Sequence, residues 1–95
     1  MKQITWDSDK NSKLIQERGV SFEDVLFCLK SGDLLDDIVH PNKDRYLNQR
    51  IFIITIERYV YLVPYVEDKS SIFLKTIIPS RKATKQYREI KNESH

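Results

Sequence analysis

The chain has 95 residues, of which 40% are hydrophobic and 32% are charged, enough for one hydrophobic core and one domain. Its single cysteine, Cys28, excludes an intrachain disulfide and a thiolate metal cluster. The longest nearly apolar run, Ile51 to Ile56, is too short to cross a bilayer, and the first residues lack the apolar stretch of a signal peptide. We therefore expect one domain over residues 1–95 that is soluble and cytoplasmic and has no membrane partner.

The net charge of +2 conceals an uneven distribution of charge along the chain. Residues 1–44 carry six Lys or Arg and nine Asp or Glu, a net charge of −3. Residues 45–95 carry ten Lys or Arg and five Asp or Glu, a net charge of +5. A basic second half suits an anionic partner, and nucleic acid is the commonest such partner of a small domain.

The beginning of the sequence predicts an edge strand followed by a helix. Gln3–Trp6 alternates between polar and apolar residues, as a half-buried strand does. Asp7 or Ser8 is placed to cap a first helix over residues 9–18, and Gly19 follows where a left-handed residue ends a helix.

A second helix and a second strand follow directly. Ser21 and Asp24 have the S-x-x-D spacing of a capping box, and Gly32 marks the end of the helix that they start. Leu34–Val39 then predicts a short strand, and the composition of residues 40–44 is that of a turn or loop.

Three more strands and a helix complete the chain. The predicted strands cover residues 46–57, 59–66 and 71–78, and their short connections favour an antiparallel meander. The last helix is predicted over residues 80–91, before a disordered tail at 92–95. The fold class that we expect is α+β: a twisted antiparallel sheet of about four to five strands, with two N-terminal helices packed on it and a C-terminal helix.

Alternation divides the 59–66 strand into two faces. One face is aliphatic and is expected to pack on the two N-terminal helices; it consists of Val60, Leu62, Pro64 and Val66. The other face is left for solvent or a ligand; it consists of Tyr59, Tyr61, Val63 and Tyr65. Aromatic rings stack on unpaired bases, so this face is a candidate RNA-binding surface. The alternative is that the strand tyrosines are ordinary strand formers on a half-exposed face.

Several kinds of chemistry lack their sequence patterns. The only glycines, Gly19 and Gly32, lie at predicted helix ends, so there is no glycine-rich phosphate loop. No H-x-x-x-H or C-x-x-C spacing exists, and we expect neither a cofactor nor a metal. What remains is phosphodiester chemistry without metal, in which RNA is cleaved by its own 2′-hydroxyl. That reaction needs proton carriers and cations that stabilise the developing charge.

The candidate residues for this chemistry are mostly cations in the second half of the chain. As phosphate clamps we assign Arg50, Lys75, Arg81 and Lys82. The candidate proton carriers are His40, Glu57, Glu67 and Tyr65. The alternative for His40 is an ordinary loop residue beside a proline. Residues expected to bind RNA are Arg45, Tyr61, Tyr65, Lys85 and Arg88.

Four motifs, spread from residue 6 to about residue 87, resemble the BrnT family of type II toxins within the wider RelE/ParE-like toxin superfamily. They are Trp6-Asp7-x-x-Lys10, R-G-V-S-F-E at 18–23, Asp44-Arg45-Tyr46 and S-R-K-A-T at 80–84. The resemblance implies an α+β fold with a twisted antiparallel sheet and two helices near the N-terminus. It also matches Arg81 and Lys82 to the family's basic pair, whereas Thr76 stands where family members often have an arginine.

The same resemblance implies a function. It implies a ribonuclease that inhibits translation without a metal, and a cognate ribbon-helix-helix antitoxin that neutralises it. DNA would be contacted only indirectly, through the antitoxin. Two alternatives remain: a RelE-like module that binds RNA or a partner protein without cleaving, and a ParE-like action on a protein target such as gyrase.

Overall fold

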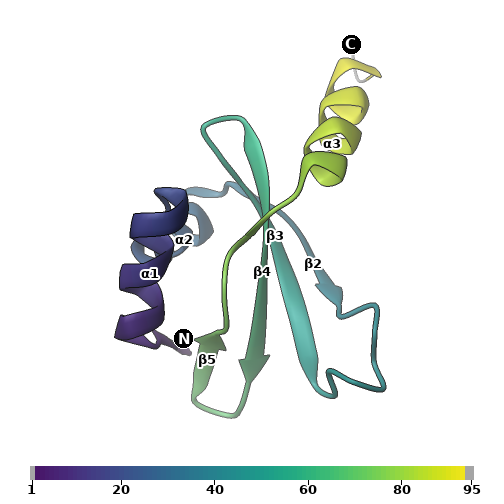
Figure 1. The fold of residues 1–95 in the computed structure, drawn as a ribbon. Coiled ribbons are helices and arrows are strands. Elements are labelled where there is room, and N and C mark those ends of the chain that lie inside the picture. Colours follow the sequence, from purple (N-terminus) through teal and green to yellow (C-terminus); the bar gives the residue numbers. More distant parts are fainter. Residues whose placement is uncertain (1, 94–95) are drawn as a thin grey trace.

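The computed structural model describes residues 2–93, which form a single sheet with helices on both of its faces (Figure 1). In chain order the elements are β1 (Gln3–Trp6), α1 (Ser8–Arg18), α2 (Phe22–Ser31), β2 (Leu34–Val39), β3 (Gln49–Ile56), β4 (Tyr59–Glu67), β5 (Ser71–Leu74), β6 (Ile78–Pro79) and α3 (Arg81–Glu93). No helix within the described residues is long and apolar enough to cross a membrane. The predicted α+β class, with two N-terminal helices and a C-terminal helix, is confirmed.

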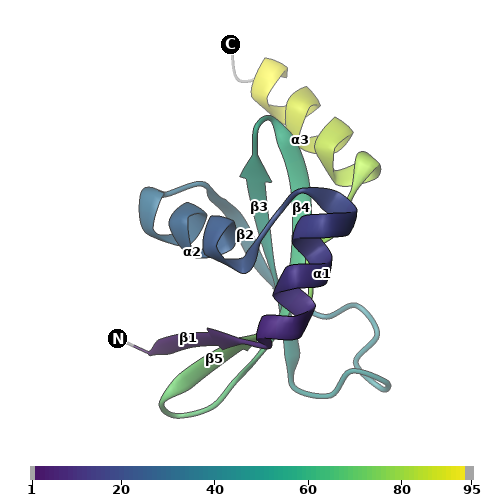
Figure 2. The ribbon, with the colours of Figure 1, turned by 60° about the vertical axis from the view of Figure 1, so that its left-hand side comes forward.

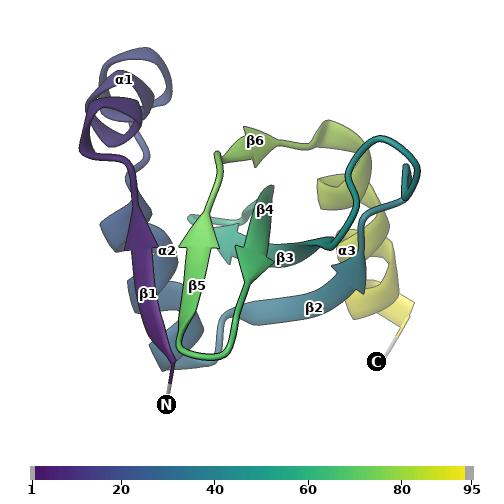
Figure 3. The same ribbon diagram turned by 90° about the horizontal axis from the view of Figure 1, so that it is seen from below.

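The strand order is β1-β5-β4-β3-β2, and β6 pairs with β4 outside this path. The meander from β2 to β5 is antiparallel, as expected for strands joined by short turns. β1 is parallel to β5, so the sheet is mixed (Figure 3). Two helices follow β1 in the chain, and no hairpin turn therefore fixes its direction.

The predicted ends of both N-terminal helices are confirmed. Asp7 caps α1, and Ser21 caps α2 in a complete capping box with Asp24. Gly19 and Gly32 end these helices at φ values of 68° and 83°, in the left-handed region that glycine tolerates best. These local signals fix the ends of α1 and α2, and packing in the main core holds both helices on one face of the sheet (Figure 2).

The predicted strand over residues 71–78 is wrong as a single element. β5 ends at Leu74, the chain leaves the ladder, and Ile78–Pro79 pairs separately with β4. Between these two short strands Ile77 is fully buried in the main core, and its carbonyl oxygen accepts a hydrogen bond from Arg18 Nη1. Core packing and this link to α1 therefore draw the segment away from a regular strand.

The two faces of the sheet are the reverse of those predicted. Val63 and Tyr65 belong to the core under α1 and α2, and Tyr61 packs against it. Val60 and Leu62, expected in that core, instead pack with Ala83 of α3 in a second, smaller core. Helices cover both faces of β4, so every residue of its aliphatic and aromatic sets is at least partly buried.

The last helix is fixed to the sheet at its start. Ser80 Oγ accepts from the Ala83 amide at 3.1 Å, which confirms Ser80 as the capping residue. Thr84 Oγ1 donates to the Ser80 carbonyl at 2.7 Å and accepts from the Val60 amide at 2.9 Å. Of the predicted disordered tail, residues 92 and 93 belong to α3, and residues 94 and 95 lie outside the described part of the chain.

Candidate nucleic-acid interface

Arg50 lies near the end of β3 that is farthest from the β3–β4 turn. In the sheet it stands opposite Tyr65 of β4 on one side and Val39 of β2 on the other. Residues paired directly across an antiparallel sheet share a face, so Arg50 lies on the face of α1 and α2. Asp37, opposite Phe52, lies on the same face one pair of positions away.

Hydrogen bonds join Arg50, Asp37 and Tyr65 into one group. Arg50 Nε donates to Asp37 Oδ1 and to the Tyr65 hydroxyl, both at 3.2 Å, and its Nη2 donates to the Asp37 carbonyl oxygen at 3.0 Å. The Tyr65 hydroxyl donates to Asp37 Oδ1 at 2.7 Å. The bonds to Tyr65 and then to Asp37 raise the pKa of Arg50, so the guanidinium stays charged.

Tyr65 cannot take the role predicted for it. Its side chain is 2% exposed, and its ring stacks on Phe52 with centroids 3.9 Å apart, so no base can stack on it. Burial, and then the hydrogen bond to Asp37, raise its pKa. The hydroxyl is therefore protonated at neutral pH and acts as a donor within the group.

A second group occupies the loop that joins β2 to β3. The ring of His40 stacks on Tyr46 with centroids 4.3 Å apart, and the guanidinium carbon of Arg45 lies 5.6 Å from the Tyr46 ring centre. His40 Nδ1 accepts from the Asn42 amide at 3.1 Å. A neutral His40 therefore carries its proton on Nε2, where it serves as a hydrogen-bond donor.

These two groups are neighbours at one end of the sheet. Val39 is paired with Arg50, and the next amide, that of His40, donates to the Gln49 carbonyl oxygen at 3.1 Å. We call the residues of both groups the Arg50 cluster: Asp37, His40, Arg45, Tyr46, Arg50 and Tyr65. Four of the predicted site residues, His40, Arg45, Arg50 and Tyr65, thus lie at the same end of the sheet.

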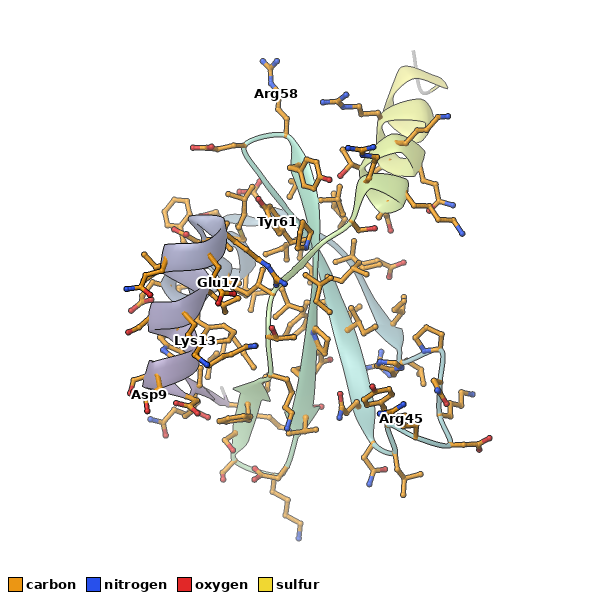
Figure 4. All side chains as sticks on the ribbon, in the orientation of Figure 1. Asp9, Lys13, Glu17, Arg45, Arg58 and Tyr61 are labelled. Atoms are coloured by element: carbon orange, nitrogen blue, oxygen red, sulfur yellow. The ribbon has the colours of Figure 1, made fainter. Side chains whose placement is uncertain are left out.

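The cations of α3 lie at the opposite end of the sheet. Arg81, Lys82, Lys85 and Arg88 are all exposed. The helix starts beside Val60, since the Ser80 amide donates to the Val60 carbonyl oxygen at 3.0 Å. Val60 and Tyr65 are five positions apart on β4, about 16 Å at about 3.3 Å per residue. Figure 4 shows Arg45 at the end opposite to α3, which lies with Arg58 at the other end.

The last two predicted residues, Lys75 and Tyr61, belong to neither group. Lys75 is exposed, and its Nζ lies 5.7 Å from the ring centre of Phe73. Phe73 is paired with Val66, on the face opposite to that of Tyr65, so Lys75 points away from Arg50. Tyr61 is partly buried against the main core, and burial raises its pKa.

The arrangement supports anion binding at two separate places. The Arg50 cluster offers a fixed guanidinium, which suits a phosphate, and an imidazole donor on the adjoining loop, whereas α3 offers a row of cations for a backbone. No three His, Cys, Asp or Glu side chains in the described part of the chain are grouped to hold a metal ion. The sequence prediction assigned neither Asp37 nor Tyr46 to phosphate binding. The contact of Asp37 with Arg50 depends on cross-strand register, and the stacking of Tyr46 on His40 depends on the path of the loop between β2 and β3.

Comparison of the chain with models of protein families, with curated proteins and with solved structures gave no match.

Proposed function

We propose that this protein is the toxin of a type II toxin–antitoxin system and that it inhibits translation as a metal-independent ribonuclease. The observation that carries the proposal is the Arg50 cluster, in which a fixed guanidinium lies beside a loop that holds a histidine. The motif resemblance and the exposed cations of α3 support the same reading.

In this proposal each part of the cluster has a chemical role. Arg50 stabilises the charge that develops on the phosphorane when the 2′-hydroxyl of RNA attacks the adjacent phosphate. His40 Nε2 donates a hydrogen bond to the leaving oxygen, because its Nδ1 is already occupied as an acceptor. Water takes the proton of the 2′-hydroxyl as it attacks, and water protonates the leaving oxygen. The cations of α3 hold the RNA backbone away from the cleaved bond.

A direct test uses purified protein and RNA in the presence of EDTA. We expect cleavage products with 2′,3′-cyclic phosphate ends, and no cleavage of DNA of the same sequence, because DNA lacks the attacking hydroxyl. Arg50→Ala should abolish cleavage. Lys69→Ala, which removes an exposed cation from the β4–β5 loop, is the matched control and should cleave like the wild type. Inducible expression should arrest growth in the wild type and spare it in Arg50→Ala.

A second candidate function is RNA or partner-protein binding without cleavage. The observation that favours it is the separation of Arg50 from Arg81 and Lys82, all of which were assigned as phosphate clamps. In this case the RNA binds and stays intact in the same assay. The ParE-like alternative gives a third outcome, in which DNA damage signals rise in cells while purified RNA is neither bound nor cut.

The proposed partner is a ribbon-helix-helix antitoxin, which contacts DNA on behalf of the complex. Val39 and Leu47, which are 47% and 74% exposed, lie between residues of the Arg50 cluster along the chain and give a partner an apolar surface there. A protein that covered them would also cover the proposed site. Co-expression with the product of a neighbouring small gene should therefore restore growth and yield a stable complex.

A further inference from the structure

The Arg50 guanidinium is held by only one of its two bidentate edges. Nε and Nη2, which form the lateral edge, donate to Asp37 and Tyr65. Within the described residues Nη1 has no hydrogen-bond partner, and the side chain is 39% exposed. The terminal edge, formed by Nη1 and Nη2, is therefore open. Two parallel N–H groups of this kind match two oxygens of a phosphate.

The orientation of this edge is fixed by the core of the protein. Stacking of Tyr65 on Phe52, with ring planes 11° apart, sets the position of the phenol oxygen. That hydroxyl donates to Asp37 Oδ1, and the same carboxylate oxygen accepts from Arg50. A free arginine side chain has about 2 kcal/mol of rotamer entropy, and fixing it beforehand removes part of the loss on binding.

We infer that Asp37 and Tyr65 are positioning residues, which hold Arg50 by its lateral edge and present its terminal edge to an RNA phosphate. The inference rests on the proposed function, because it states how the proposed RNA site holds its phosphate. Asp37 carries a negative charge and nevertheless favours RNA binding in this scheme. Its contribution comes from the geometry of the guanidinium and outweighs its repulsion of the phosphate.

The contacts of Asp37 also shield the edge of the sheet at β2, and the experiment must distinguish this role from the positioning of Arg50. His40 and Gln49 form a hydrogen-bonded pair, so the alternation of the ladder turns the amide and carbonyl of Asp37 away from β3. Asp36 Oδ1 accepts from that amide at 2.8 Å, and Arg50 Nη2 donates to that carbonyl. Side chains thus shield the edge of β2, and a shielded edge resists pairing with another chain.

The deciding experiment compares Asp37→Ala with Asp37→Asn. Affinity is measured for a fluorescent single-stranded RNA of mixed sequence, about 20 nucleotides long, at low salt. Loss of a negative charge alone strengthens RNA binding, but we expect Asp37→Ala to weaken it by about 3- to 10-fold, because Arg50 loses its anchor. Asp37→Asn keeps the oxygen that accepts from Arg50 and Tyr65, and should bind at least as well as the wild type.

Two further variants test the same geometry. Tyr65→Phe keeps the stacked ring and removes the hydroxyl, and should weaken binding about 3-fold. Arg50→Lys keeps the charge and removes the terminal edge, and should weaken binding about as much as Arg50→Ala, by about 10- to 100-fold. In the Arg50→Ala background Tyr65→Phe should have no additional effect, since a positioning residue acts only through Arg50.

The possible results separate the inference from the proposed function. If the wild type does not bind the RNA, the proposed function fails. If the wild type binds and Arg50→Ala weakens binding, but Asp37→Ala and Tyr65→Phe bind like the wild type, the positioning inference is overturned and the proposed function stands. If Asp37→Ala binds RNA normally and self-associates in gel filtration, the contacts serve edge protection, and the inference is likewise overturned.

Discussion

The two cationic regions of this protein lie at opposite ends of one sheet and differ in how their side chains are held. Arg50 makes three hydrogen bonds to two residues, one of which is buried in the main core. The four cations of α3 are exposed, on a helix that begins beside β4. A fixed guanidinium selects the geometry of its ligand, whereas exposed cations mainly supply charge. The comparison predicts that the two ends will respond differently to the same kinds of substitution.

The largest expected difference is in stability, and it compares two tyrosines. Tyr65→Ala should lower the free energy of unfolding by about 3–5 kcal/mol, because it removes a buried ring from the main core. Tyr87→Ala on α3 should lower it by about 1–2 kcal/mol, because that ring is only partly buried against the smaller core. Urea unfolding followed by circular dichroism measures both. Equal losses would show that the α3 end is as firmly packed as the Arg50 end.

The next largest effect is on RNA affinity. The triple variant Lys82→Ala, Lys85→Ala and Arg88→Ala should weaken RNA binding by about 10- to 100-fold at low salt. The slope of log affinity against log salt should fall by about 2, since each phosphate contact to a single strand contributes about 0.7. Fluorescence anisotropy at several salt concentrations gives both quantities.

The matched control for that variant keeps the charge and changes its shape. Lys82→Arg with Lys85→Arg should leave affinity within about 2-fold of the wild type, because an exposed cation acts mainly through its charge. The corresponding change at the other end, Arg50→Lys, should weaken RNA binding. A loss of affinity in the α3 control would mean that α3 also recognises phosphate by geometry.

The sequence predicts the secondary structure of this protein better than it predicts the site. Capping residues and glycines act within one helical turn, so Ser21 and Gly19 could be interpreted without knowledge of the rest of the chain. The pairing of β1 with β5 joins residues about 68 positions apart, and no local signal fixes its direction. The early end of β5 depends on core packing, which the pattern of residues 71–78 does not reveal.

The site could not be predicted because the sequence does not show which side chains of each strand face the main core. In β4 both alternating sets are apolar enough to be buried, because α3 covers the face that α1 and α2 do not. The tyrosine set was therefore interpreted as a ligand surface, and Tyr65 is instead in the core. The link between Arg50 and Asp37 joins two strands whose register is set by a bulge between Leu34 and Asp36. Such a register cannot be read from either strand alone.

A smaller effect is expected from the turn between β3 and β4, at the α3 end. Glu57 and Arg58 have φ values of 51° and 69°, and a left-handed conformation of a residue other than glycine is unfavourable by about 1–2 kcal/mol. Glu57→Asn with Arg58→Gly gives the sequence that a two-residue turn of this kind prefers. Thermal unfolding should show a gain of about 1–2 kcal/mol.

The control for the turn variant lies in the other hairpin. Lys69→Gly changes a residue outside the left-handed region, so it should lower stability slightly. The RNA affinity of the turn variant shows whether the turn takes part in the proposed RNA binding by α3. An affinity equal to that of the wild type would mean that the turn does not contact RNA. A loss of RNA affinity together with a gain in stability would mean that the side chain of Arg58 contacts RNA beside α3.

At neutral pH the smallest expected effect on stability is that of the tyrosine hydroxyls, and this effect increases at alkaline pH. Folding raises the pKa of Tyr65, so the folded chain keeps a proton that the unfolded chain loses above about pH 10. The corresponding stability is therefore complete below about pH 10 and is lost as the pH rises further. Burial also raises the pKa of Tyr87, but that ring is more exposed and lacks a carboxylate acceptor within the described residues. Urea midpoints between about pH 8 and about pH 11 should fall less steeply in Tyr65→Phe than in Tyr87→Phe. If the midpoints fell more steeply in Tyr65→Phe than in Tyr87→Phe, folding would raise the pKa of Tyr87 more than that of Tyr65, contrary to the expected difference between the two ends.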